Sequence, residues 1–168
     1  GPCIQISAGE YHTVAIQENG AVRAWGAGTT DNLSGENRGQ SIIPANLGPC
    51  IQISAGHYHT LAIQVNGTVK AWGAGLNTSY PDNWSQSVVP SDLGICSQIS
   101  AGDSHSVALK ADGTVVAWGQ NTSGQCDVPI DLGACIQIAA GEAHTVALKA
   151  NGTVRAWGLN QYGQCTLP

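Results

Sequence analysis

One nineteen-residue segment occurs four times in this chain with little change. It reads AGEYHTVAIQENGAVRAWG at 8–26 and AGHYHTLAIQVNGTVKAWG at 55–73, then AGDSHSVALKADGTVVAWG at 101–119 and AGEAHTVALKANGTVRAWG at 140–158. A cysteine and a Gln-Ile pair precede each copy, so the units begin at Cys3, Cys50, Cys96 and Cys135. Repeats of this kind indicate an architecture in which stacked units share a continuous core.

Within a unit the hydrophobic pattern is typical of strands. CIQISAG alternates isoleucine with polar residues, and the runs HTVAI and TVRAW are rich in β-branched and apolar residues. Between these two runs lies an Asn-Gly or Asp-Gly pair, which predicts a hairpin turn with positive φ at both residues. The pairs are Asn19-Gly20, Asn66-Gly67, Asp112-Gly113 and Asn151-Gly152.

We therefore predict an all-β chain of β-propeller-type blades. It would consist of four tandem repeats of three to four antiparallel strands each, as an open array or as part of a larger ring. The whole chain, residues 1–168, would be a single repeat domain. Its blades would span approximately 3–49, 50–95, 96–134 and 135–168.

The repeat resembles that of a known family. IAAGEAHTVALKANGTVRAWGLNQYGQC, from the fourth unit, is similar to the regulator of chromosome condensation repeat, and the likeness extends over all four units. That family includes a nuclear exchange factor and β-lactamase inhibitory propellers, so the resemblance implies a fold and not an activity. It implies that the repeated histidines form hydrogen bonds within a blade (His12, His59, His105, His144). It also implies that the repeated tryptophans pack between blades (Trp25, Trp72, Trp118, Trp157).

Composition narrows the function classes. Charged residues make up only 10% of the chain and the net charge is −5, which disfavours a nucleic-acid surface. No apolar run is long enough for a membrane span. The chain contains no methionine, so we expect a processed product or an excerpt of a longer protein.

Catalytic chemistry finds no support in the sequence. No Ser-His-Asp arrangement, phosphate loop or zinc-ligand spacing is present, so we predict no enzyme activity, no cofactor and no metal site. A ring of four histidines is rejected as a metal site because equivalent residues of symmetric blades lie too far apart for one ion. His57, which occurs in the second unit only, is expected to be solvent-exposed.

Six cysteines suggest an oxidising compartment. Cys96 and Cys126 have the same spacing as Cys135 and Cys165, which suggests one disulfide per blade in units three and four. Ser41 and Ser87 stand at the late position in the first two units, which leaves Cys3 and Cys50 to pair with each other, to stay buried and free, or to pair across a chain junction. A Cys126–Cys135 bond and buried free thiols remain alternatives.

Sequons point to the same compartment. Four N-x-S/T sites follow Trp-Gly, in the loop whose length varies between units, and are candidates for N-glycosylation (Asn32, Asn77, Asn83, Asn121). Asn66 and Asn151 are weaker candidates, because hairpin formation by itself explains Asn-Gly-Thr. Trp84 and Tyr80 are the residues best suited to stack on a sugar.

We predict the first of the three functions below and keep the other two as alternatives. The first is an extracellular or secreted, non-enzymatic scaffold, structural or adhesive, which is N-glycosylated on outer loops and assembles head to tail with copies of itself. The second is a propeller that binds a protein partner with its loop tips, as an inhibitor or exchange factor does. The third is a lectin.

Overall fold

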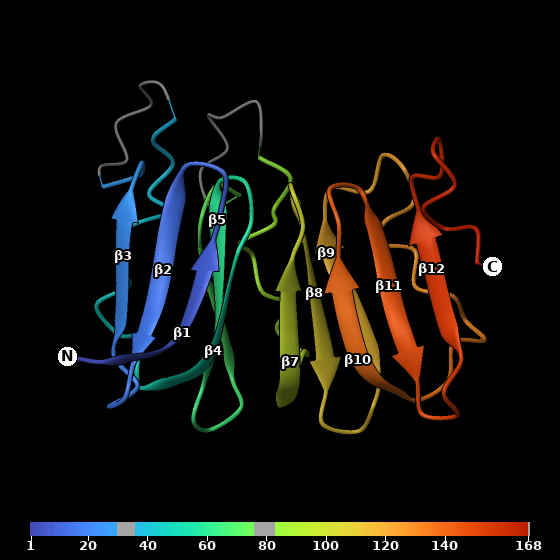
Figure 1. Cartoon of the computed structure of the whole chain (residues 1–168), viewed down its shortest axis with the longest axis horizontal. Coiled ribbons are helices and arrows are strands. Elements are labelled where there is room, and N and C mark those ends of the chain that lie inside the picture. Colours follow the sequence, from blue (N-terminus) through green and yellow to red (C-terminus); the bar gives the residue numbers. More distant parts are fainter. Residues whose placement is uncertain (30–35, 76–82, 168) are drawn as a thin grey trace.

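The structure, a computed structural model, describes residues 1–29, 36–75 and 83–167. Its described residues contain twelve strands in four three-stranded antiparallel sheets, with the strands of each sheet in chain order (Figure 1). The sheets are β1 (Cys3–Ala8), β2 (His12–Gln17) and β3 (Val22–Gly26); β4 (Cys50–Ala55), β5 (His59–Gln64) and β6 (Val69–Gly73); β7 (Cys96–Ala101), β8 (His105–Lys110) and β9 (Val115–Gly119); β10 (Cys135–Ala140), β11 (His144–Lys149) and β12 (Val154–Gly158).

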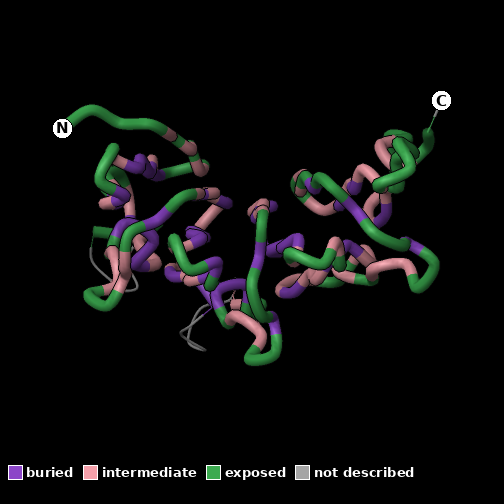
Figure 2. Tube along the Cα trace, turned by 90° about the horizontal axis from the view of Figure 1, so that it is seen from below, coloured by how far each residue is buried: buried purple, intermediate pink, exposed green. Residues whose placement is uncertain are grey.

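The predicted all-β repeat architecture is confirmed. The four sheets, here named blades 1 to 4 in chain order, stand side by side, and the first strands β1, β4, β7 and β10 contact one another in sequence. The array is unclosed: viewed along the blades it is an open arc with the two termini at its opposite ends (Figure 2). No helix long and apolar enough to cross a membrane occurs among the described residues.

The hairpin turns differ from the predicted type. In each blade the glycine has positive φ, but the preceding Asn or Asp does not. In blade 1, Gly20 N–H donates to the Gln17 carbonyl and Gln17 N–H donates to Ala21, which defines a three-residue loop with a glycine bulge. The Asn19 side chain accepts the N–H of Ala21 at 3.0 Å, so it stabilises the turn without adopting positive φ.

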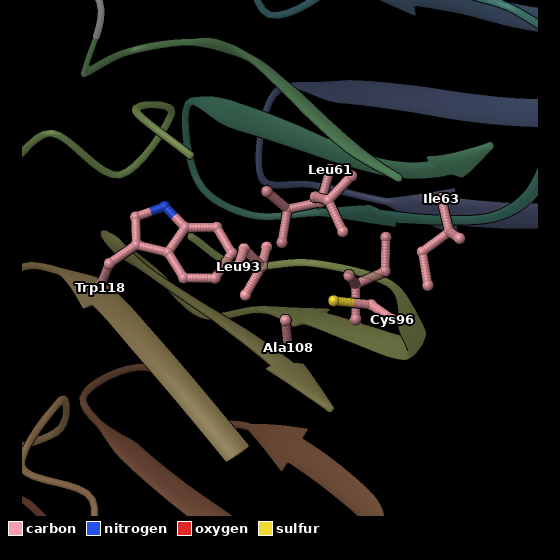
Figure 3. Packing of buried hydrophobic residues seen from close by; sticks show 8 residues of the cluster. Leu61, Ile63, Leu93, Cys96, Ala108 and Trp118 are labelled. Atoms are coloured by element: carbon pink, nitrogen blue, oxygen red, sulfur yellow. The ribbon is translucent and has the colours of Figure 1, made fainter. Parts of the chain in front are cut away.

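The core lies between blades rather than within one. Between blades 2 and 3, Leu61 and Ile63 of β5 pack against Leu93, near the end of the second unit, and against Cys96, Ala108 and Trp118 of the third unit (Figure 3). Equivalent clusters fill the other two junctions. A three-stranded sheet cannot bury both of its faces alone, so each blade depends on its neighbours for stability.

Two ends of the blades can be distinguished. The turns between first and second strands and the residues directly after Trp-Gly lie at the upper end in Figure 1, because Gly26 pairs with His12. The repeat cysteines and the Asn-Gly hairpins lie at the lower end. The segments that differ most between repeats therefore begin at the upper end, directly after Trp-Gly.

Candidate functional site

A hydrogen-bond network at each blade junction uses the repeated histidine. His12 Nε2 lies 2.8 Å from the hydroxyl oxygen of Thr60 in blade 2, and that hydroxyl donates to the Gln40 carbonyl at 3.1 Å. Trp72 Nε1 donates to the same carbonyl at 2.9 Å. The expected bond within one blade is therefore wrong: the histidine of one blade bonds to the next blade.

The same network recurs at the other junctions. His59 bonds to Ser106 and His105 to Thr145, and both hydroxyls donate to glutamine carbonyls that also accept an indole N–H. Those carbonyls belong to Gln86 and Gln125. Because the hydroxyl proton is used on the carbonyl, the histidine Nε2 must carry the proton in this hydrogen bond.

Burial keeps these histidines neutral. It lowers the pKa of His59 to about 3 and the pKa values of His12 and His105 to about 4, since the charged ring would lose its hydration. A second contact joins the first strands: Gln5 Oε1 accepts the N–H of Ile53 at 3.0 Å, and Ser7 accepts the N–H of Ala55 at 3.0 Å. Polar and apolar contacts together therefore join each blade to the next.

The end faces of the array carry the same groups without partners. On blade 1 the Thr13 hydroxyl and the Trp25 indole have no hydrogen bond within the described part of the chain, and Trp25 is 51% exposed, against 3% for Trp72. On blade 4, His144 and the Gln164 carbonyl occupy the positions of His12 and Gln40. Each end face therefore carries one half of the groups that an internal junction pairs.

The apolar parts of the end faces also match. Val146, Leu148 and Val154 line an open groove of about 270 Å³ on blade 4. Their equivalents in blade 1, which include Val14 and Ile16 at 0% exposure, are covered by blade 2. The residues that cover them there are Cys50, Ile53, Ala62 and Trp72, which correspond to Cys3, Ile6, Ala15 and Trp25 on the end face of blade 1.

A second candidate region lies at the upper end of all four blades. The turns after Ala-Gly place Glu10, His57, Asp103 and Glu142 around a hollow of about 350 Å³. Glu10, His57 and Asp103 are close enough to be candidate ligands of one metal ion. His57 is not the solvent-exposed residue expected from the sequence, since its side chain is only 22% exposed and lies between two carboxylates.

Aromatic residues adjoin this hollow. Tyr11 and Tyr58 stack with ring centroids 5.6 Å apart, and Tyr58 donates a hydrogen bond to Glu36. Burial, followed by Glu36, raises the pKa of Tyr58, whereas the hydrogen bond with Glu10 is the main cause of the raised pKa of Tyr11. The Arg38 guanidinium lies 5.0 Å from the centre of the Tyr58 ring.

The predicted disulfide within each of blades 3 and 4 is wrong, since all six cysteines are free thiols. Cys96 pairs with Lys110 at the lower end of β8, whereas Cys126 Sγ lies 3.1 Å from the Gln120 carbonyl at the upper end. Six strand residues separate these ends, about 17 Å by the usual rise, and a disulfide requires Cα atoms within about 7 Å. Cys135 and Cys165 lie apart in the same way.

The two other disulfides considered from the sequence, Cys126–Cys135 and Cys3–Cys50, are absent as well. The Cys126–Cys135 bond would join an upper end to a lower end, and Cys3 and Cys50 are not bonded to each other. The late cysteines, Cys126 and Cys165, occupy a position that is serine in the first two units. There Ser41 and Ser87 donate hydrogen bonds to the carbonyls of Ala27 and Ala74. The thiols replace these hydroxyls.

The candidate sugar-related residues divide into three groups. Asn32, Asn77 and Tyr80 lie outside the described residues. Asn121 is exposed, but it holds its loop, since its oxygen accepts the N–H of Cys126 and its amide donates to Asp127. The remaining candidates are accessible or partly accessible: Asn66, Asn83, Asn151 and Trp84, the last at 40% exposure.

Comparison with known proteins identifies the repeat. The model of the regulator of chromosome condensation (RCC1) repeat matches residues 3–35, 50–79, 96–125 and 135–164. The chain belongs to the RCC1 repeat family. No curated protein sequence matches it.

Several solved structures resemble the array. Human WBSCR16 is 20% identical with a TM-score of 0.74, over 93% of this chain and 47% of that chain. Prp20p of Saccharomyces cerevisiae is 26% identical with a TM-score of 0.71, over 99% of this chain and 46% of that one. The ectodomain of the Physcomitrella patens receptor kinase CR4 is 21% identical with a TM-score of 0.71, over 94% and 39%. The chain thus spans less than half the length of these solved chains.

Sequence reasoning missed two functional features. The glutamine carbonyl that joins neighbouring blades was not singled out, although Gly-Gln or Ser-Gln recurs near the end of every unit. The convergence of the residues after Ala-Gly was missed because their types differ from blade to blade. Their constant position in the repeat was the signal that could have revealed it.

Proposed function

We propose that this chain is a non-enzymatic scaffold, structural or adhesive, that assembles head to tail with copies of itself through its end faces. One observation carries the proposal: groups that are paired at every internal junction are present and unpaired on the two end faces. In the docked arrangement, His144 and the Gln164 carbonyl of one copy would bond to Thr13 and Trp25 of the next. Such a heterologous contact closes a ring or extends as a filament.

One position distinguishes the end junction from the internal ones. Ser7, Ser54 and Ser100 each accept a backbone N–H from the next blade, but blade 4 has Ala139 there. A docked copy would leave the N–H of its Ala8 without this acceptor. A missing hydrogen bond of this kind costs about 0.5–1.5 kcal/mol, so we expect association between copies to be reversible.

The test measures assembly directly. Sedimentation velocity of the 168-residue chain over a wide concentration range should show mass increasing with concentration. Ile6→Thr should weaken association at least tenfold, since Ile6 is 74% exposed while Ile53, its equivalent in a junction, is 2% exposed. Ala139→Ser should strengthen it about two- to tenfold by restoring the acceptor.

Ile4→Thr is the matched control. Ile4 is 63% exposed, and its equivalents Ile51 and Ile136 stay 56% and 61% exposed beside neighbouring blades, so this position takes no part in a junction. The variant should associate as the parent does. A chain that stays monomeric at every concentration, or equal effects of Ile4→Thr and Ile6→Thr, would refute head-to-tail docking.

The proposal includes secretion and N-glycosylation. Asn66 and Asn151 are exposed and Asn83 is partly exposed, which supports access for a glycan. An ectodomain among the similar structures is consistent with blades of this kind outside the cell. Native protein should lose mass on enzymatic removal of N-glycans, and an unchanged mass would contradict this part.

A second candidate is binding of a basic protein at the upper end. The carboxylates of Glu10, Asp103 and Glu142 line the hollow there, and Tyr11 beside it is 39% exposed. Among the similar structures, yeast RCC1 (Prp20) was solved bound to Kap60, at 20% identity and a TM-score of 0.70 over 94% of this chain and 44% of that one. The Prp20p structure was described with its binding properties to Gsp1p and histones.

Histones provide a direct probe of this second candidate. Saturable binding of core histones that weakens at least fivefold in a Glu10→Gln, Glu142→Gln double variant would support it. Binding that is absent, or that the double variant leaves unchanged, would count against it.

A further inference from the structure

The side chains after Ala-Gly come together because the turns of adjacent blades are in close contact. A Cβ added to Gly9 would lie 2.4 Å from the Gly56 carbonyl oxygen, so only glycine permits this approach. The residues that follow these glycines are thereby brought to one hollow. Among the described residues that line it, three are carboxylates, one is His57, and none is lysine or arginine.

His57 occupies a defined position between two of the carboxylates. Its Nδ1 lies 2.5 Å from Asp103 Oδ1 and its Nε2 lies 2.9 Å from Glu10 Oε2. The ring stacks on Tyr58 with centroids 3.9 Å apart. Asp103 is also held, since its Oδ2 accepts a hydrogen bond from the Ser104 hydroxyl at 3.1 Å. Both oxygens of Asp103 are thus engaged in orienting the site.

The contact between His57 Nε2 and Glu10 is compatible with either of two cations between these atoms: a proton on the ring, as in an ion pair, or a metal ion. If Nδ1–H donates to Asp103, Nε2 of the neutral ring has a lone pair that faces a carboxylate oxygen of Glu10. Nε2 is buried and forms no hydrogen bond of acceptable geometry. Two electron pairs facing each other at this distance repel unless a cation lies between them.

We propose that a divalent transition-metal ion of the zinc class binds between His57 Nε2 and the Glu10 carboxylate. Zinc binds imidazole nitrogen and carboxylate oxygen at about 2.0–2.2 Å, and two ligands of a tetrahedral ion then lie about 3.4 Å apart. The exposed Glu10 side chain would have to move by about 0.5 Å from its present 2.9 Å separation to accept the ion. Asp103 is the positioning residue: a carboxylate on the second ring nitrogen is the usual partner of a metal-bound histidine. Water completes the coordination on the open side, and the ion joins blade 1 to blade 2.

The ligand types favour this class of ion over the hard cations. Calcium prefers six to eight oxygen ligands and magnesium a near-octahedral set of oxygens, and neither favours an imidazole. The proposal is independent of head-to-tail assembly, because all its groups lie within blades 1 to 3 of a single chain.

The experiment is calorimetric titration of the EDTA-treated, dialysed chain with zinc chloride at pH 7.5. We expect one ion per chain, and His57→Gln and Glu10→Gln should each weaken binding at least tenfold. Asp103→Asn should weaken it about 10- to 100-fold through the ring orientation. Cobalt(II) provides a spectroscopic test, since its visible absorption should change on binding to the parent and not to His57→Gln.

Glu142→Gln is the matched control. Glu142 follows Ala-Gly in blade 4 and lines the same hollow, but it does not contact His57 in the structure. This variant should bind zinc within twofold of the parent. Absence of zinc binding by the parent would overturn the proposal. It would mean that a proton, and not a metal ion, lies between His57 and Glu10. Equal losses in Glu142→Gln and Glu10→Gln would also overturn it, because a diffuse acidic field would then explain the binding.

Discussion

His59 of blade 2 lies with its Nε2 3.0 Å from the hydroxyl oxygen of Ser106 in blade 3, and the His59 side chain is fully buried. The hydroxyl is oriented by the Gln86 carbonyl, to which it donates at 2.8 Å. This chain of contacts links a strand of one blade, a strand of the next and the loop between them. The repeated histidine is therefore a connector between blades, and it belongs to the scaffold rather than to a catalytic site.

Removal of this connector should be costly. His59→Ala leaves a cavity and an unsatisfied hydroxyl lone pair, so we expect a loss of about 2–4 kcal/mol in the free energy of unfolding. His144→Ala, at the same repeat position but without a following blade, should lose less than about 1 kcal/mol. Urea unfolding at pH 7 measures both. Equal losses would contradict the connector role.

The protein should lose stability as the pH decreases, because the buried histidines resist protonation in the folded state. Their folded pKa values of about 3 to 4 lie below the unfolded value of about 6.5, so protons bind preferentially to the unfolded chain. The stabilisation is complete above pH 6.5 and is lost as the pH falls toward 4. Each histidine should contribute up to about 1.4 kcal/mol per pH unit within that window.

The measurement is urea unfolding at pH 7, 6 and 5, above the range in which most carboxylates titrate. His105→Asn should have a shallower dependence than the parent, because it lacks one of the buried titrating rings. An unchanged slope in this variant would show that other groups cause the pH dependence.

Two glycines with similar backbone angles should respond differently to alanine. Gly73 has φ of +98°, and a Cβ there would lie 2.4 Å from the Tyr58 carbonyl oxygen. Gly152 has φ of +85° and no atom within 4 Å of such a Cβ. Gly152→Ala should cost about 1–2 kcal/mol from backbone strain alone, and Gly73→Ala should cost at least about 2 kcal/mol more. Thermal unfolding of the two variants compares these costs.

The cysteines should titrate as thiols. Unfolded, unreduced protein should react with six equivalents of an alkylating reagent, since all six are free in the structure. Cys126→Ser should change stability by no more than about 0.5 kcal/mol, because Ser41 and Ser87 fill the same position in blades 1 and 2. A mass lower by two hydrogens and a large loss in Cys126→Ser would instead indicate a disulfide.

The sequence by itself determined the repeat, the strand class and the end of each blade where variation occurs. These follow from local signals: period-two alternation, the Asn-Gly turn and the fourfold recurrence of one segment. Local signals failed where a residue acts on another blade. His12 bonds to Thr60, forty-eight positions away, and nothing near His12 in the chain indicates that partner.

Only the tertiary structure decided which repeated positions meet. Strand direction separates Cys96 from Cys126 although their spacing suggested a pair, because the two thiols lie at opposite ends of a blade. Stacking of successive glycine turns brings Glu10, His57 and Asp103 together, although they come from three different units. Contacts between repeats depend on how the blades stack, and that is set by the packing of whole sheets rather than by the residues adjacent in the chain.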